Sequence, residues 1–462
     1  MMKEKKEYCG IFGVFNHPQA VQMTYLGLYS LQHRGEESCG MAVTDGKKIY
    51  QLTGMGLVPD VLKKKKIEGL KGKTAIGHVR YSTTGSSIIR NAQPFVIKHH
   101  DFSVSIAHNG NLTNAVKLRR KLEKNGSIFQ TTMDSEVVLH LLVRSDEKLI
   151  EDRLIDALRC CEGAYSMVAL TRNKLIGVRD PYGFRPLCIG VINGSHVLAS
   201  ESCTLDLLGA EYLRDVEPGE IVVISRKGLK SIKPFKNSKI AQCIFEYIYF
   251  ARPDSRIFGD SVYKVRERLG MKSAEESPAK ADLVMSIPDS GNYAALGYAK
   301  RSGIPFEFGM IRNHYVGRTF IQPSQDMRDH GVKVKLNPIK EVLKGKSVVV
   351  VEDSIVRGTT TGSRIKTLRE AGVKKIHMRI SCPPIRYPCF YGIDFPNRKE
   401  LIANNKSIEE IAEFIGVDSL RYLSLEGMLE AVRGVKNNFC TACFSGAYPT
   451  KVGKCADKCS LE

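Results

Sequence analysis

Residues 348–372 read VVVVEDSIVRGTTTGSRIKTLREAG, and this stretch predicts the fold of the second half of the chain. Its run of valines is a compact apolar strand that ends in two adjacent acids, Glu352 and Asp353. A loop containing Gly358 then leads into a helix. A second apolar strand, ADLVMSIP at residues 281–288, is also followed by a turn and a helix. Such units are typical of a parallel α/β sheet that binds ligands at the carboxyl ends of its strands.

The loop after the valine strand has the chemistry of a phosphate site. Thr359, Thr360 and Thr361 offer hydroxyls, and backbone amides at a helix N-terminus attract anions. The two carboxylates beside the loop suit ribose hydroxyls or a bound magnesium ion. The alternative is an ordinary strand-to-helix turn with capping threonines, and the paired acids favour the ligand site.

With these motifs in this order, the second half resembles the type I phosphoribosyltransferases. SIPDSGNYAA, residues 286–295, resembles the loop that holds pyrophosphate, and the basic stretch 312–338 resembles the family's mobile lid. Two departures bear on magnesium: Glu352 stands where the family often has aspartate, and Gly291 where many relatives have serine. The resemblance implies that phosphoribosyl pyrophosphate binds Asp289, Ser290, Gly291, Arg318, Lys333, Lys335, Glu352, Asp353, Arg357, Gly358, Thr359 and Thr360, and that magnesium binds Ser290, Glu352 and Asp353.

The first half begins with a cysteine whose position needs explanation. CGIFG, residues 9–13, places Cys9 before an apolar run, where the simplest alternative is a buried cysteine on a first strand. A cysteine nucleophile needs a base to form thiolate, and no histidine stands in a recognisable cysteine-protease pattern. A free α-amine at Cys9 would serve, because its pKa of about 8 is close to working pH.

Three further motifs supply what a glutamine site needs. Arg80 in GHVRYSTTG suits a bidentate grip on a carboxylate, and Asp134 in TTMDSE suits an ammonium group. Asn109 and Gly110 in AHNGNL offer a side-chain amide and a backbone N–H for an oxyanion hole. In this order the first half resembles the glutamine amidotransferases of the N-terminal nucleophile class. QHRGEESCG, which contains Arg34, and RDPYGFRPL also fit that family's pattern.

A glutaminase half followed by a phosphoribosyltransferase half is a narrow combination, and the chain resembles the amidophosphoribosyltransferase family from Cys9 to about Pro449. The resemblance implies an α+β sandwich of αββα layers over residues 9–232 and an α/β domain with a parallel sheet over residues 233–462. It implies conversion of glutamine, phosphoribosyl pyrophosphate and water to 5-phosphoribosylamine, glutamate and pyrophosphate. Ammonia would pass inside the protein. Feedback inhibition by purine nucleotides and a homotetramer are further expectations.

Three other functions remain to be separated from this one. A phosphoribosyltransferase that uses free ammonia would not need the intact set Cys9, Arg80, Asn109 and Asp134. An amidotransferase that makes glucosamine phosphate would carry sugar-isomerase domains in place of residues 282–372. A nucleotide-sensing regulator on the phosphoribosyltransferase fold would not need a glutamine site. Glutamate release that depends on phosphoribosyl pyrophosphate distinguishes all three.

Four cysteines form a candidate metal centre. Cys440 and Cys443 make a C-x-x-C pair, which alone is a weak sign of metal. In one branch of the family, cysteines in the contexts of Cys243, Cys389, Cys440 and Cys443 hold a 4Fe–4S cluster. Four thiolates also suit zinc on chemical grounds, and free thiols are the remaining alternative. Cys455 and Cys459 have no assigned role.

The bulk composition is that of a cytoplasmic protein. With 69 lysines and arginines against 49 acids the net charge is +20, which raises nucleic-acid binding as a possibility. No nucleic-acid module accompanies the charge, so we expect no nucleic-acid partner. The sequence contains no secretory h-region before Cys9 and no apolar run of about 20 residues, so no membrane association is expected.

Residues 1–8 are predicted to be a propeptide. While Tyr8 is joined to Cys9, the nitrogen of Cys9 is an amide and cannot accept a proton. Attack of the Cys9 thiol on the Tyr8 carbonyl is the expected route of cleavage.

Overall fold

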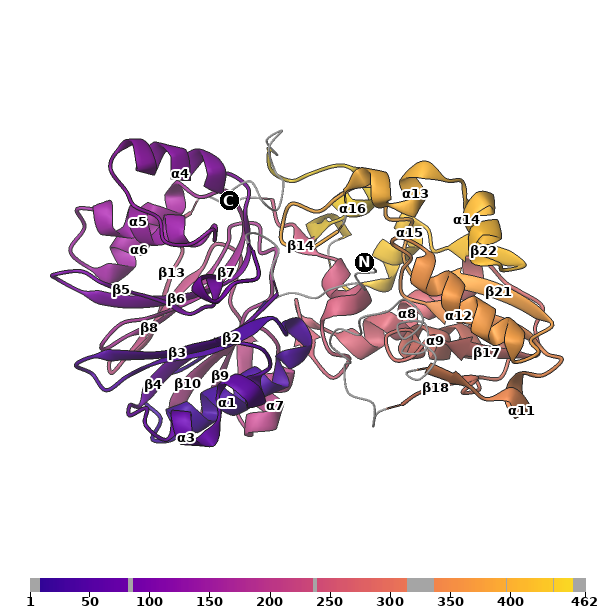
Figure 1. The fold of residues 1–462 in the computed structure, drawn as a ribbon, viewed down its shortest axis with the longest axis horizontal. Helices are drawn as coiled ribbons and strands as arrows, with labels where there is room; N and C mark the ends of the chain where they lie inside the picture. Colours follow the sequence, from indigo (N-terminus) through magenta and orange to yellow (C-terminus); the bar gives the residue numbers. More distant parts are fainter. Residues whose placement is uncertain are drawn as a thin grey trace.

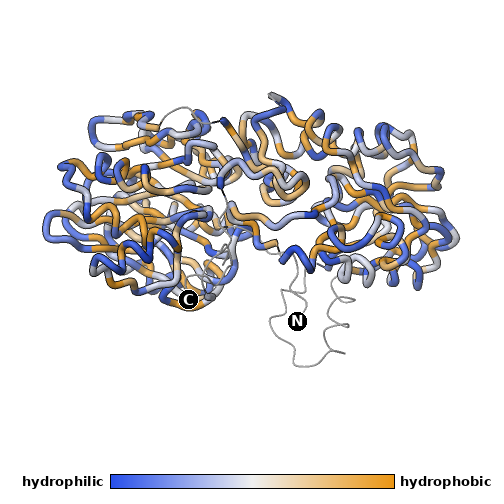
Figure 2. Tube along the Cα trace, turned by 90° about the horizontal axis from the view of Figure 1, so that it is seen from above, coloured by the Kyte–Doolittle hydropathy of each residue, from blue (hydrophilic) through white to orange (hydrophobic). Residues whose placement is uncertain are grey.

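The computed structural model describes residues 9–81, 86–235, 239–313, 336–395, 397–434 and 436–451. Figure 1 shows two halves side by side, with the first half in indigo to magenta and the second in pink to yellow. In Figure 2 hydrophobic segments run through the interior of both halves, and hydrophilic segments lie mainly at the outer turns. None of the described helices is both long enough and apolar enough to cross a membrane.

Two antiparallel sheets form the centre of the described first half. The seven-stranded sheet contains, in spatial order, β11 (Glu211–Asp215), β9 (Cys188–Ile192), β10 (Ser195–Ala199), β1 (Gly10–Val14), β4 (Thr74–Arg80), β2 (Ser38–Thr44) and β3 (Ile49–Met55). The six-stranded sheet contains β13 (Gly228–Ile232), β12 (Ile221–Ser225), β8 (Leu175–Arg179), β7 (Gly163–Leu170), β6 (Ser103–Leu112) and β5 (Phe95–Lys98).

The two sheets stack and are covered by helices on their outer faces (Figure 1). Successive side chains of a strand point to opposite faces, so Ile11 of β1 packs between the sheets while Phe12 packs toward α1 (Ala20–Ser30). The outer face of the seven-stranded sheet carries α1 and α7 (Cys203–Leu208), and that of the six-stranded sheet carries α4 (Ala115–Lys124), α5 (Glu136–Arg144) and α6 (Ile150–Arg159). The predicted αββα sandwich is confirmed.

The second half is built on a parallel sheet, as predicted. Among the described residues this sheet has four strands in the order β17 (Leu283–Ser286), β20 (Ser347–Glu352), β21 (Lys375–Ile380) and β22 (Ser419–Tyr422). The valines of β20 alternate between two cores. Helices α12 (Thr359–Glu370) and α14 (Ile408–Ile415) pack on one face, and α9 (Asn292–Ser302) packs on the other.

Helices α8 (Val262–Glu276) and α9 cross at close range through two glycines, Gly270 of α8 and Gly297 of α9. A Cβ at Gly270 would lie 1.8 Å from the carbonyl oxygen of Ala294, so only glycine permits this crossing. The remaining described elements are η1 (Gln32–Arg34), α2 (Val58–Val61), α3 (Lys64–Ile67), η2 (Ile89–Asn91), β14 (Gln242–Cys243), the π-helix η3 (Glu246–Phe250), β15 (Arg256–Ile257), β16 (Asp260–Ser261), β18 (Met310–Arg312), β19 (Leu336–Pro338), α11 (Lys340–Leu343), η4 (Arg398–Glu400), α13 (Ile402–Asn405), α15 (Leu425–Ala431), η5 (Lys436–Asn438), β23 (Phe439–Cys440) and α16 (Ala442–Ser445).

One segment differs from its sequence-based interpretation. The lysine-rich stretch 225–239 reads as a polar crossing between domains, but residues 228–232 form the edge strand β13. Leu229 and Ile232 are its two apolar side chains, and both pack against the sandwich cores. An edge strand tolerates lysines on its open side, which is why the charge pattern concealed it.

Candidate active sites

The Cys9 thiol is buried at the start of β1. Its S–H donates to the carbonyl oxygen of Tyr81 at 3.5 Å. Burial raises the pKa of Cys9 to about 11, while the charge of Arg80 lowers it and those of Glu37 and Asp134 raise it. The thiol is therefore protonated near neutral pH and needs a base during reaction. These electrostatic effects also place Arg80 and Asp134 in the neighbourhood of the thiol.

Arg80 and Asp134 are both fixed by the backbone around them. Arg80 ends β4, is fully buried, and donates from both terminal nitrogens to the Ser86 carbonyl at 3.3 Å. Asp134 accepts from the N–H of Leu112 at 2.8 Å, which ties it to the end of β6. A buried cation and a buried anion near one thiol match the two charges of a free amino acid.

Asn109 and Gly110 stand at adjacent positions of β6. The side-chain oxygen and nitrogen of Asn109 are buried, and neither has a hydrogen-bond partner within the described part of the chain. Buried polar atoms are usually paired, so a group of this kind points to a ligand. Gly110 has φ = 150°, and a Cβ there would lie 2.0 Å from the carbonyl oxygen of Ala164. The predicted oxyanion pair thus combines an amide whose two polar atoms lack protein partners with a position that only glycine can occupy.

The histidines near this site hold structure together. The Nε2–H of His78 donates to the His108 carbonyl at 3.0 Å, which joins β4 to β6 across the two sheets. Burial lowers the pKa of His78 to about 3, so its ring stays neutral. His78 lies two residues before Arg80, and His108 immediately precedes Asn109. This bond therefore brings the strand ends that carry the predicted glutamine-binding and oxyanion residues to the same edge.

The second half brings its predicted pyrophosphate loop against the end of β20. The hydroxyl of Ser290 donates to Asp353 Oδ2, and Asp353 Oδ1 accepts from Ser354. A Cβ at Gly291 would lie 2.6 Å from the carbonyl oxygen of Val351, so a serine at this position would not fit this backbone. Asp289 is exposed and pairs with Arg312 at 2.6 Å. Ser290 and Asp353 of the predicted magnesium set are in contact.

Glu352, the unusual first acid, is held by the helix that follows it. Its Oε1 accepts from Arg364 at 2.7 Å, and its Oε2 accepts from the hydroxyl of Thr361 at 3.2 Å. Both donors belong to α12, whose N-cap is Gly358 with φ = 77°. The longer glutamate side chain is therefore used to fasten the first turns of α12 to the end of β20.

The other predicted phosphate-binding residues lie at the start of α12 or outside the described part. Thr359 is exposed and Thr360 half-buried, and Arg357 pairs with Glu400 at 2.7 Å. Arg318, Lys333 and Lys335 of the predicted lid lie outside the described residues, as do residues 1–8, Cys455 and Cys459.

The four candidate ligand cysteines come together at the junction of the two halves. Cys243 of β14 and Cys440 of β23 are direct partners in a parallel strand pair. Burial raises the pKa of Cys443, and the charges of Cys389, Cys440 and Cys243 raise it further, so all four thiols are neighbours. Cys389 and Cys440 also pack against a cluster that contains Phe184 of the first half.

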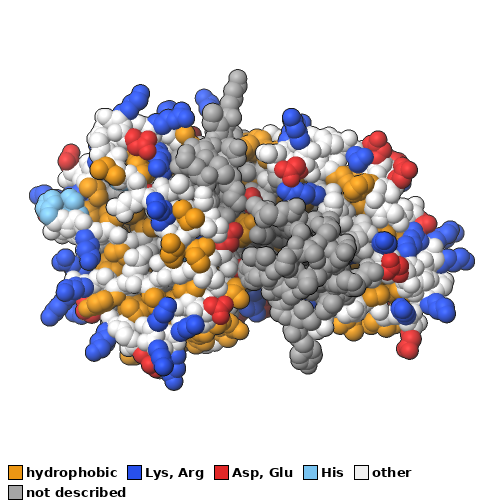
Figure 3. Space-filling model, viewed as in Figure 1, with side chains coloured by type: hydrophobic (Ala, Val, Ile, Leu, Met, Phe, Trp, Pro, Cys, Tyr) orange, Lys and Arg blue, Asp and Glu red, His pale blue; other side chains and the backbone are white. Residues whose placement is uncertain are grey.

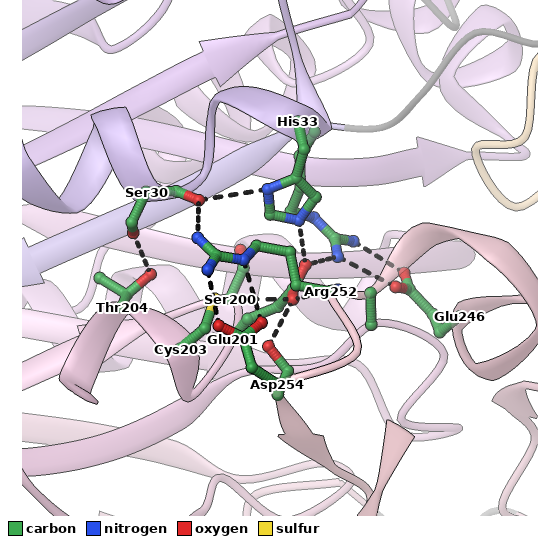
Figure 4. A network of polar contacts seen from close by, with 12 residues as sticks. Ser30, His33, Ser200, Glu201, Cys203, Thr204, Glu246, Arg252 and Asp254 are labelled. Carbon is green, nitrogen blue, oxygen red and sulfur yellow. Dashed lines mark hydrogen bonds and ion pairs between the residues drawn. The ribbon is translucent and has the colours of Figure 1, made fainter. Parts of the chain in front are cut away.

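A buried ionic network between the halves was not predicted from the sequence (Figure 4). Glu246 accepts from Arg34 at 2.8 Å and from Arg185 at 2.9 Å. Glu201 pairs with Arg34 and accepts from His33 at 2.8 Å. Arg34 and Arg185 lie within the two motifs that fit the amidotransferase pattern. Glu246 lies in the apolar run CIFEYIYF, where an acid without a local partner is the only sequence signal.

Comparisons with known proteins agree with this geometry. The glutamine amidotransferase domain family matches residues 78–206. The chain is 52% identical to amidophosphoribosyltransferase 1, chloroplastic, of Arabidopsis thaliana, over 97% of this chain and 80% of that protein. It is 47% identical to the amidophosphoribosyltransferase of Bacillus subtilis (strain 168), over 98% of this chain and 96% of that protein.

Two solved structures share the whole architecture. One, described as the allosteric regulatory enzyme of purine biosynthesis, has a TM-score of 0.94 and 46% identity and covers 98% of both chains. The other is glutamine phosphoribosylpyrophosphate amidotransferase from B. subtilis complexed with ADP and GMP. Its TM-score is 0.92 and its identity 47%, over 96% of this chain and 98% of that one.

Proposed function

The chain belongs to the amidophosphoribosyltransferase family, and from that membership we propose how its own residues divide the reaction. The enzyme uses glutamine, phosphoribosyl pyrophosphate and water to make 5-phosphoribosylamine, glutamate and pyrophosphate, the first committed step of purine synthesis. Glutamine is hydrolysed at Cys9 in the first half, and the ammonia is transferred to the ribose in the second half.

The observation that carries the glutaminase assignment is the buried amide of Asn109, whose two polar atoms lack partners among the described residues. Arg80 binds the α-carboxylate of glutamine, and Asp134 binds its α-ammonium group. The Cys9 thiolate attacks the side-chain amide carbon, and a tetrahedral oxyanion forms. The Asn109 amide and the Gly110 N–H stabilise that oxyanion, and the resulting thioester is hydrolysed to glutamate.

The base is the α-amine of Cys9, which exists only after the bond between Tyr8 and Cys9 is cut. The raised pKa of the Cys9 thiol supports the need for a base close to the sulfur. Burial that keeps His78 neutral with a pKa of about 3 supports an amine over an imidazole. The proton taken from the thiol is later returned to the departing ammonia by the same amine.

In the second half, Asp289, Ser290 and Gly291 bind pyrophosphate, and the loop from Arg357 to Thr360 binds the 5-phosphate. The contact of Ser290 with Asp353 supports a shared site for these two segments. The family resemblance adds Arg318, Lys333 and Lys335, which lie outside the described residues, to the groups that bind this substrate. Ser290, Asp353 and Glu352 would hold magnesium, which would supply positive charge to offset that of the pyrophosphate. The ion pair of Glu352 with Arg364 makes Asp353 the principal acid.

Cys243, Cys389, Cys440 and Cys443 hold a 4Fe–4S cluster that joins the tail to both halves. A single zinc ion with bonds of about 2.3 Å requires sulfur atoms about 3.8 Å apart. Within the described residues, no three of these sulfur atoms lie within 4.8 Å of one another, so the thiols stand too far apart for a single zinc ion. The cluster supplies a rigid cross-link, and no catalytic step depends on it.

Purine nucleotides inhibit the enzyme by binding at the phosphoribosyl site. The B. subtilis structure, which is complexed with ADP and GMP, supports nucleotide binding in this family. The enzyme is a cytoplasmic homotetramer. Lysines and arginines are spread over the described part of the face in Figure 3 rather than gathered in one patch.

Glutamate release with and without phosphoribosyl pyrophosphate tests the proposal. We expect the wild-type enzyme to release glutamate faster when phosphoribosyl pyrophosphate is present. Cys9→Ala should lose glutamate release and retain synthesis of phosphoribosylamine from ammonia. Glutamate release by Cys9→Ala at the wild-type rate would refute the assignment of the nucleophile.

A further inference from the structure

Glu246 belongs to the second half, but it binds two arginines of the first half. Its side chain is completely buried, as are those of Arg34 and Arg185 to within 1%. Arg34 donates to both of its oxygens, at 2.8 and 3.0 Å, and Arg185 donates to Oε1 at 2.9 Å. Figure 4 shows the Glu246 carboxylate facing the guanidinium group that lies between it and Glu201. One carboxylate thus fixes two guanidinium groups in a dry interface.

Arg34 connects Glu246 to the nucleophile. The Nε–H of Arg34 donates to the carbonyl oxygen of Cys9 at 3.1 Å. Its other terminal contact is Glu201, whose second oxygen accepts from the N–H of Arg252 at 2.8 Å and from the hydroxyl of Ser255 at 2.7 Å. Burial alone would lower the pKa of Arg34, but the charges of Glu246 and Glu201 raise it above its ordinary value. Arg34 is therefore a permanently charged clamp on the Cys9 backbone.

Arg185 connects the same carboxylate to the oxyanion segment. Its Nη2 and Nε donate to the carbonyl oxygen of Tyr391, at 2.7 and 3.2 Å. The next residue, Gly392, approaches Gly110 so closely that a Cβ on it would lie 3.2 Å from the Gly110 carbonyl carbon. Asn111 donates to the carbonyl oxygen of Phe390 at 2.9 Å. Residues 390–392 of the second half are thus pressed against the strand that carries the oxyanion donors.

We propose that Glu246 is a positioning residue for glutamine hydrolysis, aligning the Cys9 backbone and the Gly110 segment from across the domain interface. The inference rests on the proposed function, in which Cys9 attacks glutamine and Gly110 stabilises the oxyanion. Glu246 touches neither the thiol nor the oxyanion donors in the contacts described above. It acts through Arg34 on one side and through Arg185 on the other.

Loss of the Glu246 charge has a predictable result. Arg34 then keeps its ion pair with Glu201, whereas Arg185 loses its ion pair with Glu246, which leaves an excess positive charge in a buried interface. Glutamine at position 246 keeps the size of the side chain and one acceptor oxygen, so it can hold only part of the two-arginine arrangement. A shift of the nucleophile relative to the oxyanion donors of about 1 Å is enough to cost about a hundredfold in rate.

The test compares Glu246→Gln with wild type in two assays on the processed enzyme, which begins at Cys9 and keeps both halves. We expect kcat/KM for glutamine hydrolysis to fall by about tenfold to a hundredfold, with ammonia-dependent synthesis of phosphoribosylamine within about twofold of wild type. Glu151→Gln is the matched control, because it breaks an ion pair to Lys174 of 2.6 Å in the outer helix α6. We expect it to leave both activities unchanged.

Arg34→Lys is the second variant, because it keeps the buried charge and loses the fork that joins Glu246 to the Cys9 carbonyl. The proposal predicts the same selective loss of glutamine hydrolysis. Unchanged glutamine hydrolysis in both variants would overturn it, and so would equal loss of the two activities in both. Cys9→Ala separates the two levels: if it retains glutaminase activity, the proposed function itself fails, and otherwise the result bears on Glu246 alone.

Discussion

The Cys9 thiol is expected to resist ionisation for as long as residues 1–8 remain attached. The experiment compares two forms of the protein. One begins at Cys9, and the other still carries residues 1–8, as its intact mass shows. Burial raises the pKa of Cys9 to about 11 in the structure. A free α-amine beside the sulfur has a pKa of about 8, so near that pH it can accept the proton of the thiol.

The raised pKa sets the expected size of the effect. At pH 8 a thiol of pKa about 11 is about 0.1% thiolate, against about a quarter for an ordinary cysteine of pKa about 8.5. Alkylation of Cys9 in the uncleaved chain should therefore be at least about a hundredfold slower than that of a reference thiol. Because the thiolate fraction grows tenfold with each pH unit below the pKa, the rate should keep rising until about pH 10.5.

Iodoacetamide labelling, followed by mass spectrometry of the Cys9 peptide, measures this rate from pH 7 to 10.5, with exposed Cys160 as an internal standard. The slope against pH reports ionisation whatever the accessibility of the sulfur. In the chain that begins at Cys9 we expect an inflection near pH 8, from the amine, and full glutaminase activity. A plateau at or below pH 9 in the uncleaved chain, or full glutaminase activity with residues 1–8 attached, would refute the reasoning.

Three further outcomes follow from contacts within the sites. Asn109→Ala should lower kcat for glutamine hydrolysis by about 10² to 10³ in steady-state assays and spare ammonia-dependent synthesis; equal losses would contradict the oxyanion role. Arg364→Gln should raise KM for phosphoribosyl pyrophosphate by about tenfold. Arg369→Gln is the control: Arg369 also lies on α12, but it pairs with Asp418 and not with Glu352, so its replacement should leave KM unchanged. Cys440→Ser should lower iron and sulfide per chain in protein purified without oxygen, and an unchanged content would exclude it as a ligand.

The motifs predicted more of the fold than of the contacts. Four valines in succession and a following helix are enough to expect a buried parallel strand, and β20 is one. The lysine-rich stretch that contains β13 reads as a polar crossing between domains because edge strands carry polar residues for reasons unrelated to their pairing. Leu229 and Ile232 are the available signal, but they are three positions apart and face opposite sides of the strand, so they do not give the alternating pattern of a strand.

The ionic network between the halves could not be read from the sequence at all. Arg34 and Arg185 are separated from Glu246 by 212 and 61 residues, and their contacts depend on how the two halves of the chain meet. A lone acid in an apolar run indicates only that burial would require a partner. The sequence therefore raises the question of where Glu246 finds positive charge, and only the fold supplies the answer.

Glu352 shows how a departure from a family pattern becomes intelligible in three dimensions. From the sequence, its longer side chain puts magnesium geometry in question, because the carboxylate reaches further than that of aspartate. In the structure that extra reach ends on Thr361 in the first turn of α12 and on Arg364 in the second turn. Shortening it to aspartate would withdraw the carboxylate from both donors and leave Arg364 without this acid. Glutamate at position 352 is therefore matched to Arg364 of α12. Replacing Glu352 with aspartate would leave the site undisturbed only if Arg364 were replaced as well.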